Sequence, residues 1–176
     1  LEDCLVAADA GPDLLGFIFY PPSPRIALPE DATTIIARLK QHYTHIKTVG
    51  VFVNESVEHI RQLQQNTGFD YVQLHGEEPV DVFPHFGSIA YKVLRPASEE
   101  EAITDAATYA TLGPADGPTW MIDAYDPNLY GGTGHRTDWQ AAARLAQQYP
   151  GLLLAGGLNP DNVVQAIQAV EPWGVD

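Results

Sequence analysis

Short apolar runs alternate with amphipathic stretches along the whole of this sequence. Runs such as "KTVGVFV" (47–53) and "DYVQLH" (70–75) are rich in β-branched and aromatic residues, which is typical of strands. Because a helical pattern separates each run from the next, we expect βαβ units and a parallel sheet, buried on both faces. The expected strands are 13–20, 47–53, 70–75, 89–94, 119–123, 152–157 and 173–176, and the expected helices are 1–11, 29–43, 56–68, 78–86, 98–113, 137–149 and 159–170.

Polar residues and glycines mark where these helices begin and end. Ser, Asp and Asn side chains can accept a hydrogen bond from a free N–H in the first turn, and glycine can adopt the left-handed backbone that follows a last turn. The expected N-terminal markers are Ser56, Ser98, Thr137–Asp138 and Asn159–Pro160, and the expected C-terminal caps are Gly68 and Gly113.

Two architectures suit such a pattern, an open doubly wound sheet and a closed TIM (β/α)8 barrel. The dinucleotide fingerprint and the P-loop are both absent, and "GGTG" (131–134) is too short for either. Polar residues follow several of the strands, which favours the barrel. No linker divides the sequence, so we expect one domain over 1–176. Because the sequence opens in a helix and closes in a strand, we expect a barrel incomplete at both ends.

The composition excludes several classes of protein. The formal net charge is −14, with three lysines and six arginines, so we expect neither nucleic acid nor an anionic membrane as a partner. The apolar runs are shorter than the roughly 18 residues of a membrane span. The single cysteine, Cys4, is typical of a cytoplasmic protein, and packing against the sheet explains it better than a nucleophilic role. The spacing of His, Cys and Glu residues predicts no metal site.

Candidate functional residues follow the strands, where a barrel of this kind holds its chemistry. Arg25 lies in a proline-stiffened loop, "YPPSPR", and its guanidinium group can bind a carboxylate or a phosphate. His75 can donate to a ligand or exchange a proton, although it can equally anchor its own loop. Asp123 ends an apolar run and can act as a general acid, or can instead cap its loop.

Gly156 and Gly157 end the run "LLLAGG", just before the helix expected at Asn159. Exposed backbone N–H groups at such a place bind phosphate. If one strand precedes the sequence, this is strand seven, after which many barrels bind phosphate. The remaining strand-end residues carry less weight. Asn54 is expected as a turn residue, Glu77 and Glu78 as favourable charges at a helix start, Lys92 and Arg95 as weak candidates, and Gly131, Gly132 and Gly134 as sites of close approach or of a moving lid.

The segments "GFIFYPPSPR", "VGVFVNES", "YVQLHGEE", "MIDAYDPNLYGGTGHRTDW" and "LLLAGGLNPDNV" resemble, in order, the strand-end motifs of the phosphoribosylanthranilate isomerases of tryptophan biosynthesis. The resemblance extends over residues 1–176. It implies a TIM barrel that converts N-(5'-phosphoribosyl)anthranilate into 1-(2-carboxyphenylamino)-1-deoxyribulose 5-phosphate. This Amadori rearrangement needs no cofactor.

The resemblance also implies roles for single residues. Asp123 would be the general acid that protonates the ribose ring oxygen, and Arg25 would hold the anthranilate carboxylate. The backbone at Gly156 and Gly157 would bind the phosphate group. His75 and Asp176 would line the pocket. The family's general base is a cysteine in a "K-I-C-G" motif at the end of the first strand, a motif that residues 1–176 do not contain.

Two alternatives stay open. One is another sugar-phosphate barrel enzyme such as indole-glycerol-phosphate synthase, whose chemistry uses a lysine acid, whereas these strand ends are poor in lysine. The other is a barrel that binds a phosphate ligand without catalysis, because one proton-transfer group lies outside the sequence. Fusion to, or association with, another enzyme of the tryptophan pathway also stays open.

Overall fold

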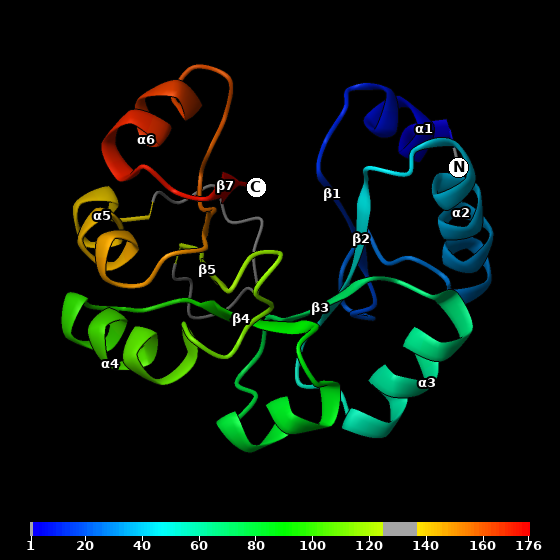
Figure 1. The fold of residues 1–176 in the computed structure, drawn as a ribbon, viewed down its shortest axis with the longest axis horizontal. Coiled ribbons are helices and arrows are strands. Elements are labelled where there is room, and N and C mark those ends of the chain that lie inside the picture. Colours follow the sequence, from blue (N-terminus) through cyan, green and yellow to red (C-terminus); the bar gives the residue numbers. More distant parts are fainter. Residues whose placement is uncertain (1, 125–136) are drawn as a thin grey trace. The chain divides into compact units, whose positions relative to one another are not determined.

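The computed structural model describes residues 2–124 and 137–176, so the predictions for Gly131, Gly132 and Gly134 lie outside the described residues. The chain divides into two compact units, unit 1 (Leu1–Ile89) and unit 2 (Ala90–Asp176). Figure 1 shows strands alternating with helices in each of them. Each unit is described by itself below.

Unit 1 is built on three parallel strands in the order β1-β2-β3. Leu14 pairs with Lys47 and Val49 with Tyr71, so neighbouring strands run in the same direction and a helix follows β1 and β2. The 3-10 helix η1 follows β3. Its elements are α1 (Glu2–Asp9), β1 (Leu14–Ile18), α2 (Pro29–His42), β2 (Lys47–Phe52), α3 (Val57–Thr67), β3 (Tyr71–Leu74) and η1 (Val80–Phe86).

Unit 2 is built on four parallel strands in the order β4-β5-β6-β7. Lys92 pairs with Trp120, Trp120 with Leu152, and Leu153 with Gly174. A helix again separates consecutive strands. The elements are β4 (Ala90–Leu94), α4 (Glu99–Tyr109), β5 (Trp120–Ile122), α5 (Trp139–Gln148), β6 (Leu152–Leu154), α6 (Val163–Val170) and β7 (Gly174–Val175).

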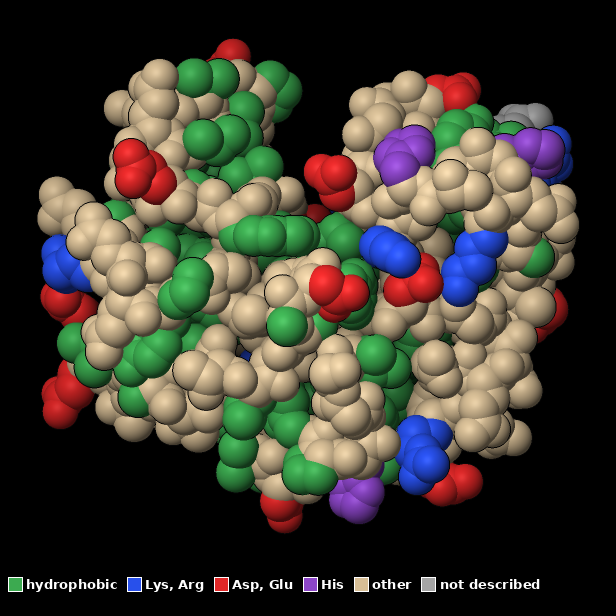
Figure 2. Space-filling view, in the orientation of Figure 1, with side chains coloured by type: hydrophobic (Ala, Val, Ile, Leu, Met, Phe, Trp, Pro, Cys, Tyr) green, Lys and Arg blue, Asp and Glu red, His purple; other side chains and the backbone are tan. Residues whose placement is uncertain are grey.

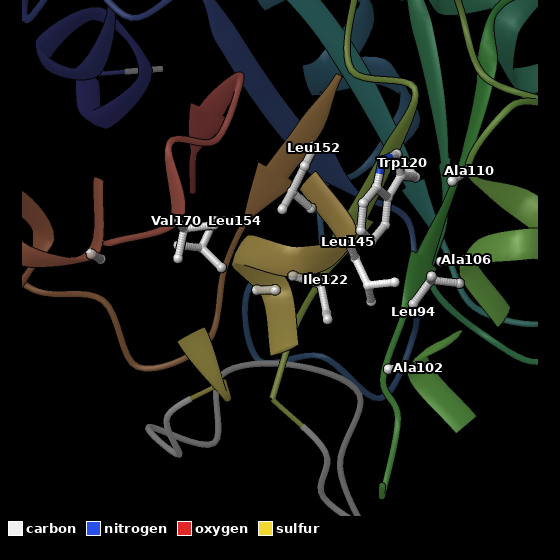
Figure 3. Packing of buried hydrophobic residues seen from close by; sticks show 12 residues of the cluster. Leu94, Ala102, Ala106, Ala110, Trp120, Ile122, Leu145, Leu152, Leu154 and Val170 are labelled. Carbon is white, nitrogen blue, oxygen red and sulfur yellow. The ribbon is translucent and has the colours of Figure 1, made fainter. Parts of the chain in front are cut away.

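Large strand side chains and mostly small helix side chains form the core of unit 2 (Figure 3). Trp120 is fully buried in β5, and its indole N–H donates to the Tyr149 carbonyl at 3.1 Å. Alanines on α4 face it, which lets that helix approach the sheet closely. The cluster consists of Leu94, Ala102, Ala106, Ala110, Trp120, Ile122, Ala142, Leu145, Leu152, Leu154, Ala166 and Val170.

The predicted helix starts are mostly confirmed. Ser56 and Ser98 accept hydrogen bonds from N–H groups in the first turns of α3 and α4. Asp138 caps α5 by accepting from the N–H groups of Gln140 and Ala141. Gly68 ends α3 in the left-handed conformation that glycine favours, with φ 75°.

Three predictions at helix ends are wrong. α4 ends at Tyr109, so Gly113 is not its cap. α6 begins at Val163 instead of Asn159. The Asn159 side chain accepts a hydrogen bond from the Asp161 N–H, and the chain forms a turn there before the helix begins. The helix expected at 78–86 is the shorter η1, which contains Pro84; a proline lacks the N–H that an α-helix interior requires.

Four large apolar side chains at the end of unit 2 are exposed. Figure 2 shows hydrophobic side chains on the surface over α6 and the segment that follows it. They are Val164, Ile167, Trp173 and Val175. Within the described ranges, no helix is both long and apolar enough to cross a membrane.

Candidate active site

Asp123 and the Gly156–Gly157 pair lie at the same edge of the unit 2 sheet. Asp123 follows β5 directly, and the glycines follow the neighbouring parallel strand β6. The Ala155 N–H donates to the Ile122 carbonyl at 2.9 Å, which continues the pairing to the strand ends. Because the carboxyl ends of parallel strands meet at one edge, the acid and the glycine pair are neighbours, as the sequence predicts.

The Asp123 carboxylate is only 8% exposed. One of its oxygens accepts a hydrogen bond from the Ala124 N–H at 2.7 Å, and the Asp123 N–H donates to the Leu94 carbonyl at 2.9 Å. Ile122 packs in the helix-facing cluster, so the alternation of the strand directs Asp123 to the opposite face of the sheet. A buried carboxyl group at a strand end is suited to proton transfer.

A cavity of about 250 Å3 lies where α4 and α5 begin. Asp123 lines it together with Thr137 and Asp138, whereas Gly156 and Gly157 are not among the described residues around it. Ala102 and Ala141, which also line it, come from the two helices. The cavity therefore lies at the carboxyl end of β5, against the starts of α4 and α5. The sheet edge that Asp123 shares with the two glycines defines the candidate site.

Gly156 and Gly157 both have left-handed backbone, with φ +91° and +65°, a region that glycine enters without strain. A Cβ atom at Gly156 would lie 2.8 Å from the Ala124 nitrogen and closer still to the Thr137 hydroxyl. Only glycine fits there. Within residues 2–124 and 137–176, nothing accepts a hydrogen bond from the N–H groups of Gly156, Gly157 or Leu158. Such successive N–H groups suit an anion.

Asp176 follows β7 at this same edge, and its N–H donates to the Leu154 carbonyl at 2.9 Å. Tyr91, on β4, is buried. Burial raises the pKa of the Tyr91 hydroxyl, and the negative charge of Asp176 raises it further. The Tyr91 hydroxyl therefore stays neutral near physiological pH.

Arg25 and His75 belong to unit 1, at the carboxyl ends of β1 and β3. Ile26 forms a β-bridge with Ile18, which returns the loop to the end of β1 and places the exposed Arg25 beside it. His75 is 7% exposed, and its Nδ1 lies 3.0 Å from the Gln73 side-chain nitrogen. The His75 N–H donates to the Phe52 carbonyl, so the loop start is ordered.

A buried clamp beside His75 was not predicted. Glu78 is 5% exposed, and its carboxylate accepts from the Asn54 N–H at 2.8 Å and from the Gly76 N–H at 2.9 and 3.1 Å. The Asn54 side chain in turn accepts from the Glu77 N–H at 2.6 Å. The helix-dipole role expected for Glu78 is therefore wrong. Its carboxylate joins the loops that follow β2 and β3.

The sequence held one signal for this clamp. A Cβ atom at Gly76 would lie 2.6 Å from the Asn54 nitrogen, so the glycine in "LHGEE" allows the two loops to touch. Asn54 has φ 52°, a conformation that asparagine tolerates better than most residues. A glycine and an asparagine at neighbouring strand ends were therefore a sign of loop contact, although neither one identifies the acceptor.

Lys92 faces the helix layer of unit 2. Its side chain is 5% exposed, and its Nζ lies 5.9 Å from the centre of the Tyr109 ring on α4. This contact settles the direction that the sequence left open. Lys92 therefore points away from the sheet face to which the strand alternation directs Asp123. Cys4 is half-buried on α1 and not at a strand end.

The chain matches the family model described as N-(5'phosphoribosyl)anthranilate (PRA) isomerase over residues 1–176. It is also 41% identical to the N-(5'-phosphoribosyl)anthranilate isomerase of Hahella chejuensis, over 100% of this chain and 78% of that protein. The chain belongs to the phosphoribosylanthranilate isomerase family. The predicted family is thus confirmed, and the match covers the whole of the given sequence.

Solved structures of phosphoribosylanthranilate isomerases share the fold. The Thermotoga maritima enzyme superposes with a TM-score of 0.86 at 33% identity, over 100% of this chain and 82% of that one. A second structure, with a TM-score of 0.82 and 32% identity over 100% of this chain and 80% of that one, is a complex with reduced 1-(o-carboxyphenylamino)-1-deoxyribulose 5-phosphate. The TIM (β/α)8 fold class predicted from the sequence is confirmed.

The structure brings four of the six predicted site residues to one edge, namely Asp123, Gly156, Gly157 and Asp176 in unit 2. Arg25 and His75 lie at the corresponding edge of unit 1, where the strands are also parallel. The prediction that the barrel lacks its first strand and its C-terminal end stays a prediction.

Proposed function

We propose that this chain carries out the reaction of its family, the conversion of N-(5'-phosphoribosyl)anthranilate into 1-(2-carboxyphenylamino)-1-deoxyribulose 5-phosphate. The observation that carries the proposal is the contact between the chain after Asp123 and Gly156, at one edge of the unit 2 sheet. A buried acid and three successive N–H groups there match a substrate with a ring oxygen to protonate and a phosphate to hold.

Asp123 is the proposed general acid. A proton passes from its carboxyl group to the ribose ring oxygen, the bond from that oxygen to C1' breaks, and the aniline nitrogen forms a Schiff base with C1'. Loss of the proton on C2' then gives an enolamine, which becomes the ketone product. The burial of Asp123 limits competing exchange with water.

The substrate's two anionic groups need separate partners. We assign the phosphate to the phosphate loop, which we define as residues 155–158. The N–H groups of Gly156, Gly157 and Leu158 have no acceptor among residues 2–124 and 137–176. We assign the anthranilate carboxylate to the exposed guanidinium group of Arg25, which can bind it with two parallel hydrogen bonds. His75 and Asp176 complete the proposed lining. With a formal net charge of −14, such local donors matter more than the overall field.

The base that removes the C2' proton is not assigned within residues 1–176. The family resemblance calls for a cysteine at a strand end, and Cys4 lies on α1 instead. We therefore propose that the cysteine that acts as the general base is not Cys4 and lies in a part of the protein outside the given sequence. We make two further proposals. The protein works in a reducing cytoplasm, and it is fused to or associated with another tryptophan-pathway enzyme.

Two other functions are less well supported. Indole-glycerol-phosphate synthase chemistry uses a lysine acid, whereas Lys92 is directed at the Tyr109 ring on α4. Phosphate binding without catalysis is favoured by one observation, the lack of a strand-end cysteine in the given sequence. A protein of this second kind would bind product and phosphate yet show no turnover.

The test is turnover of N-(5'-phosphoribosyl)anthranilate by this chain and by a chain extended at its amino terminus with the upstream codons. Product is measured by chromatography, and binding of a reduced product analogue by calorimetry. We expect the extended chain to turn over substrate and the given chain to bind the analogue. Binding without turnover in both chains would establish the non-catalytic alternative, and absence of binding in both would refute the proposal.

A further inference from the structure

Two side chains hold the phosphate loop through hydrogen bonds to its carbonyl groups. The Thr137 hydroxyl, at the start of α5, donates to the Ala155 carbonyl at 2.8 Å. The Asn162 amide nitrogen, just before α6, donates to the Gly157 carbonyl at 2.9 Å. We propose that Thr137 and Asn162 are positioning residues for phosphate binding, because they fix two of the three peptide planes of the loop. The inference rests on the proposed function.

Fixing a carbonyl also fixes the N–H of the same peptide group. In a planar trans peptide, the C=O and the following N–H point in opposite directions. Holding the Ala155 carbonyl on Thr137 therefore turns the Gly156 N–H away from α5. Holding the Gly157 carbonyl on Asn162 likewise turns the Leu158 N–H away from α6. They are two of the three N–H groups of the phosphate loop, none of which has an acceptor within the described residues.

Asn162 is suited to this position because it uses both ends of its amide group. Its Oδ1 accepts from the Asn159 N–H at 2.9 Å while its Nδ2 donates to the Gly157 carbonyl. An aspartate has no donor for that carbonyl, and a leucine has neither group. The two bonds together define which way the amide faces.

Glycine makes such anchors necessary. Gly156 and Gly157 have φ +91° and +65°, and a glycine peptide rotates more freely than any other. Without the anchors, the loop would sample orientations in which a carbonyl oxygen faces the phosphate. Ordering the loop before the ligand arrives removes that cost from binding. The phosphate group does not react. Loss of an anchor should therefore weaken the binding of the phosphate and leave the chemical step unchanged.

The experiment uses the extended chain introduced above as the parent chain and inorganic phosphate as the probe. Titrations followed by 15N–1H NMR report the amide shifts of Gly156, Gly157 and Leu158. Thr137→Val and Asn162→Leu remove the anchoring bonds with little change in shape. We expect each to weaken phosphate binding roughly tenfold, the usual size of one hydrogen bond. Thr137→Ser keeps the hydroxyl and should stay within about twofold of the parent chain.

A control separates positioning from loss of stability. Ser56→Ala removes the hydrogen bond that caps α3 in unit 1, and this loss of stability is comparable to the loss of one anchoring hydrogen bond. It should leave the phosphate affinity unchanged. In the catalytically active enzyme, Thr137→Val and Asn162→Leu should raise KM by a similar tenfold factor and leave kcat within about twofold.

The outcomes are distinguishable. If phosphate shifts none of the three amides in the parent chain, the assignment of the phosphate in the proposed function is wrong, and this inference is wrong with it. If the parent chain responds and both anchor variants bind phosphate with unchanged affinity, only the positioning roles are overturned. A Thr137→Ser variant as weak as Thr137→Val would overturn the role of the hydroxyl.

Discussion

The Glu78 carboxylate accepts a hydrogen bond from the backbone N–H of Asn54 at 2.8 Å, across 24 residues of sequence. The same carboxylate holds the Gly76 N–H, so one buried charge orders the loops after β2 and β3. His75, a proposed lining residue, lies between β3 and this clamp. The clamp therefore orders the strand ends of unit 1 around His75.

Glu78→Gln should destabilise the protein by about 2 kcal/mol, because the new amide NH2 group cannot accept from the N–H groups that the carboxylate satisfies. The measurement is urea unfolding at neutral pH. Glu77→Gln is the matched control, since Glu77 is the exposed neighbour of the same type, and it should change stability by less than about 0.5 kcal/mol. Equal losses for the two variants would contradict the clamp.

Asp123→Asn should lower kcat of the active enzyme by at least about a hundredfold, because an amide cannot deliver a proton to the ring oxygen. The side chain keeps its size and its acceptor for the Ala124 N–H, so the fold should persist. Asp81→Asn, the same exchange at an exposed position on η1, provides the comparison and should leave kcat unchanged. Turnover retained in Asp123→Asn would remove this residue from the mechanism.

Arg25→Ala should raise KM by about tenfold to a hundredfold, as expected when a charged hydrogen bond of about 1.5–3 kcal/mol is lost. Arg25→Lys should recover only part of the affinity, because an ammonium group does not bind a carboxylate with two parallel bonds. Steady-state kinetics measure both variants. Arg38→Ala, at an exposed position on α2, controls for the loss of charge. An unchanged KM in Arg25→Ala would count against the carboxylate role.

Gly156→Ala should abolish phosphate binding, because its Cβ would meet the Ala124 nitrogen at 2.8 Å and the loop would have to move. Gly11→Ala separates this clash from backbone strain. Gly11 has φ +73°, and a Cβ there would meet nothing within 4 Å. Both variants should lose about 1 kcal/mol of stability from the left-handed backbone, and only Gly156→Ala should lose the amide shifts with phosphate. Intact binding in Gly156→Ala would show that the loop tolerates a side chain.

Asp70 makes the stability of unit 1 depend on pH. Partial burial acts to raise the pKa of Asp70, but hydrogen bonds from the Thr48 N–H and hydroxyl, together with the Lys40 ammonium group, outweigh it and hold the pKa below its usual value. A lowered folded-state pKa stabilises the protein fully above the unfolded pKa of about 3.9, and the contribution disappears as pH falls through the folded value.

Asp70→Asn should therefore cost about 1 kcal/mol at pH 7, a value reduced for partial exposure. The difference between the parent chain and the variant should shrink steadily below about pH 4. Urea unfolding at pH 7, 5 and 3 measures it. A difference that is as large at pH 3 as at pH 7 would show that the carboxylate charge is not the cause.

Much of the candidate site could be predicted because its residues follow strands. Asp123 and Gly156 follow apolar runs that are recognisable from composition alone, and parallel pairing brings the ends of such runs to one edge. The caps at Ser56, Ser98 and Asp138 were likewise predictable, since each accepts an N–H two or three residues away. Signals of this kind are local, and local sequence contains them.

The failures share another cause. Glu78 resembled a charge at a helix start until a partner 24 residues earlier appeared beside it. The late start of α6 depends on the turn at Asn159 and on Asn162, whose amide reaches back to the Gly157 carbonyl. The direction of Lys92 depended on where α4 places Tyr109. Each depends on which loop or helix approaches, which no neighbouring residue reports.

The sequence by itself therefore determined the order of strands and helices, the family, and the residues that stand at the strand ends, because periodicity and capping act over a few positions. The tertiary structure alone decided which acceptor each loop N–H finds and which carbonyls Thr137 and Asn162 hold. Those choices depend on contacts between segments far apart in the chain. A buried polar group must find a hydrogen-bond partner, and in these cases the partner is set by the three-dimensional structure.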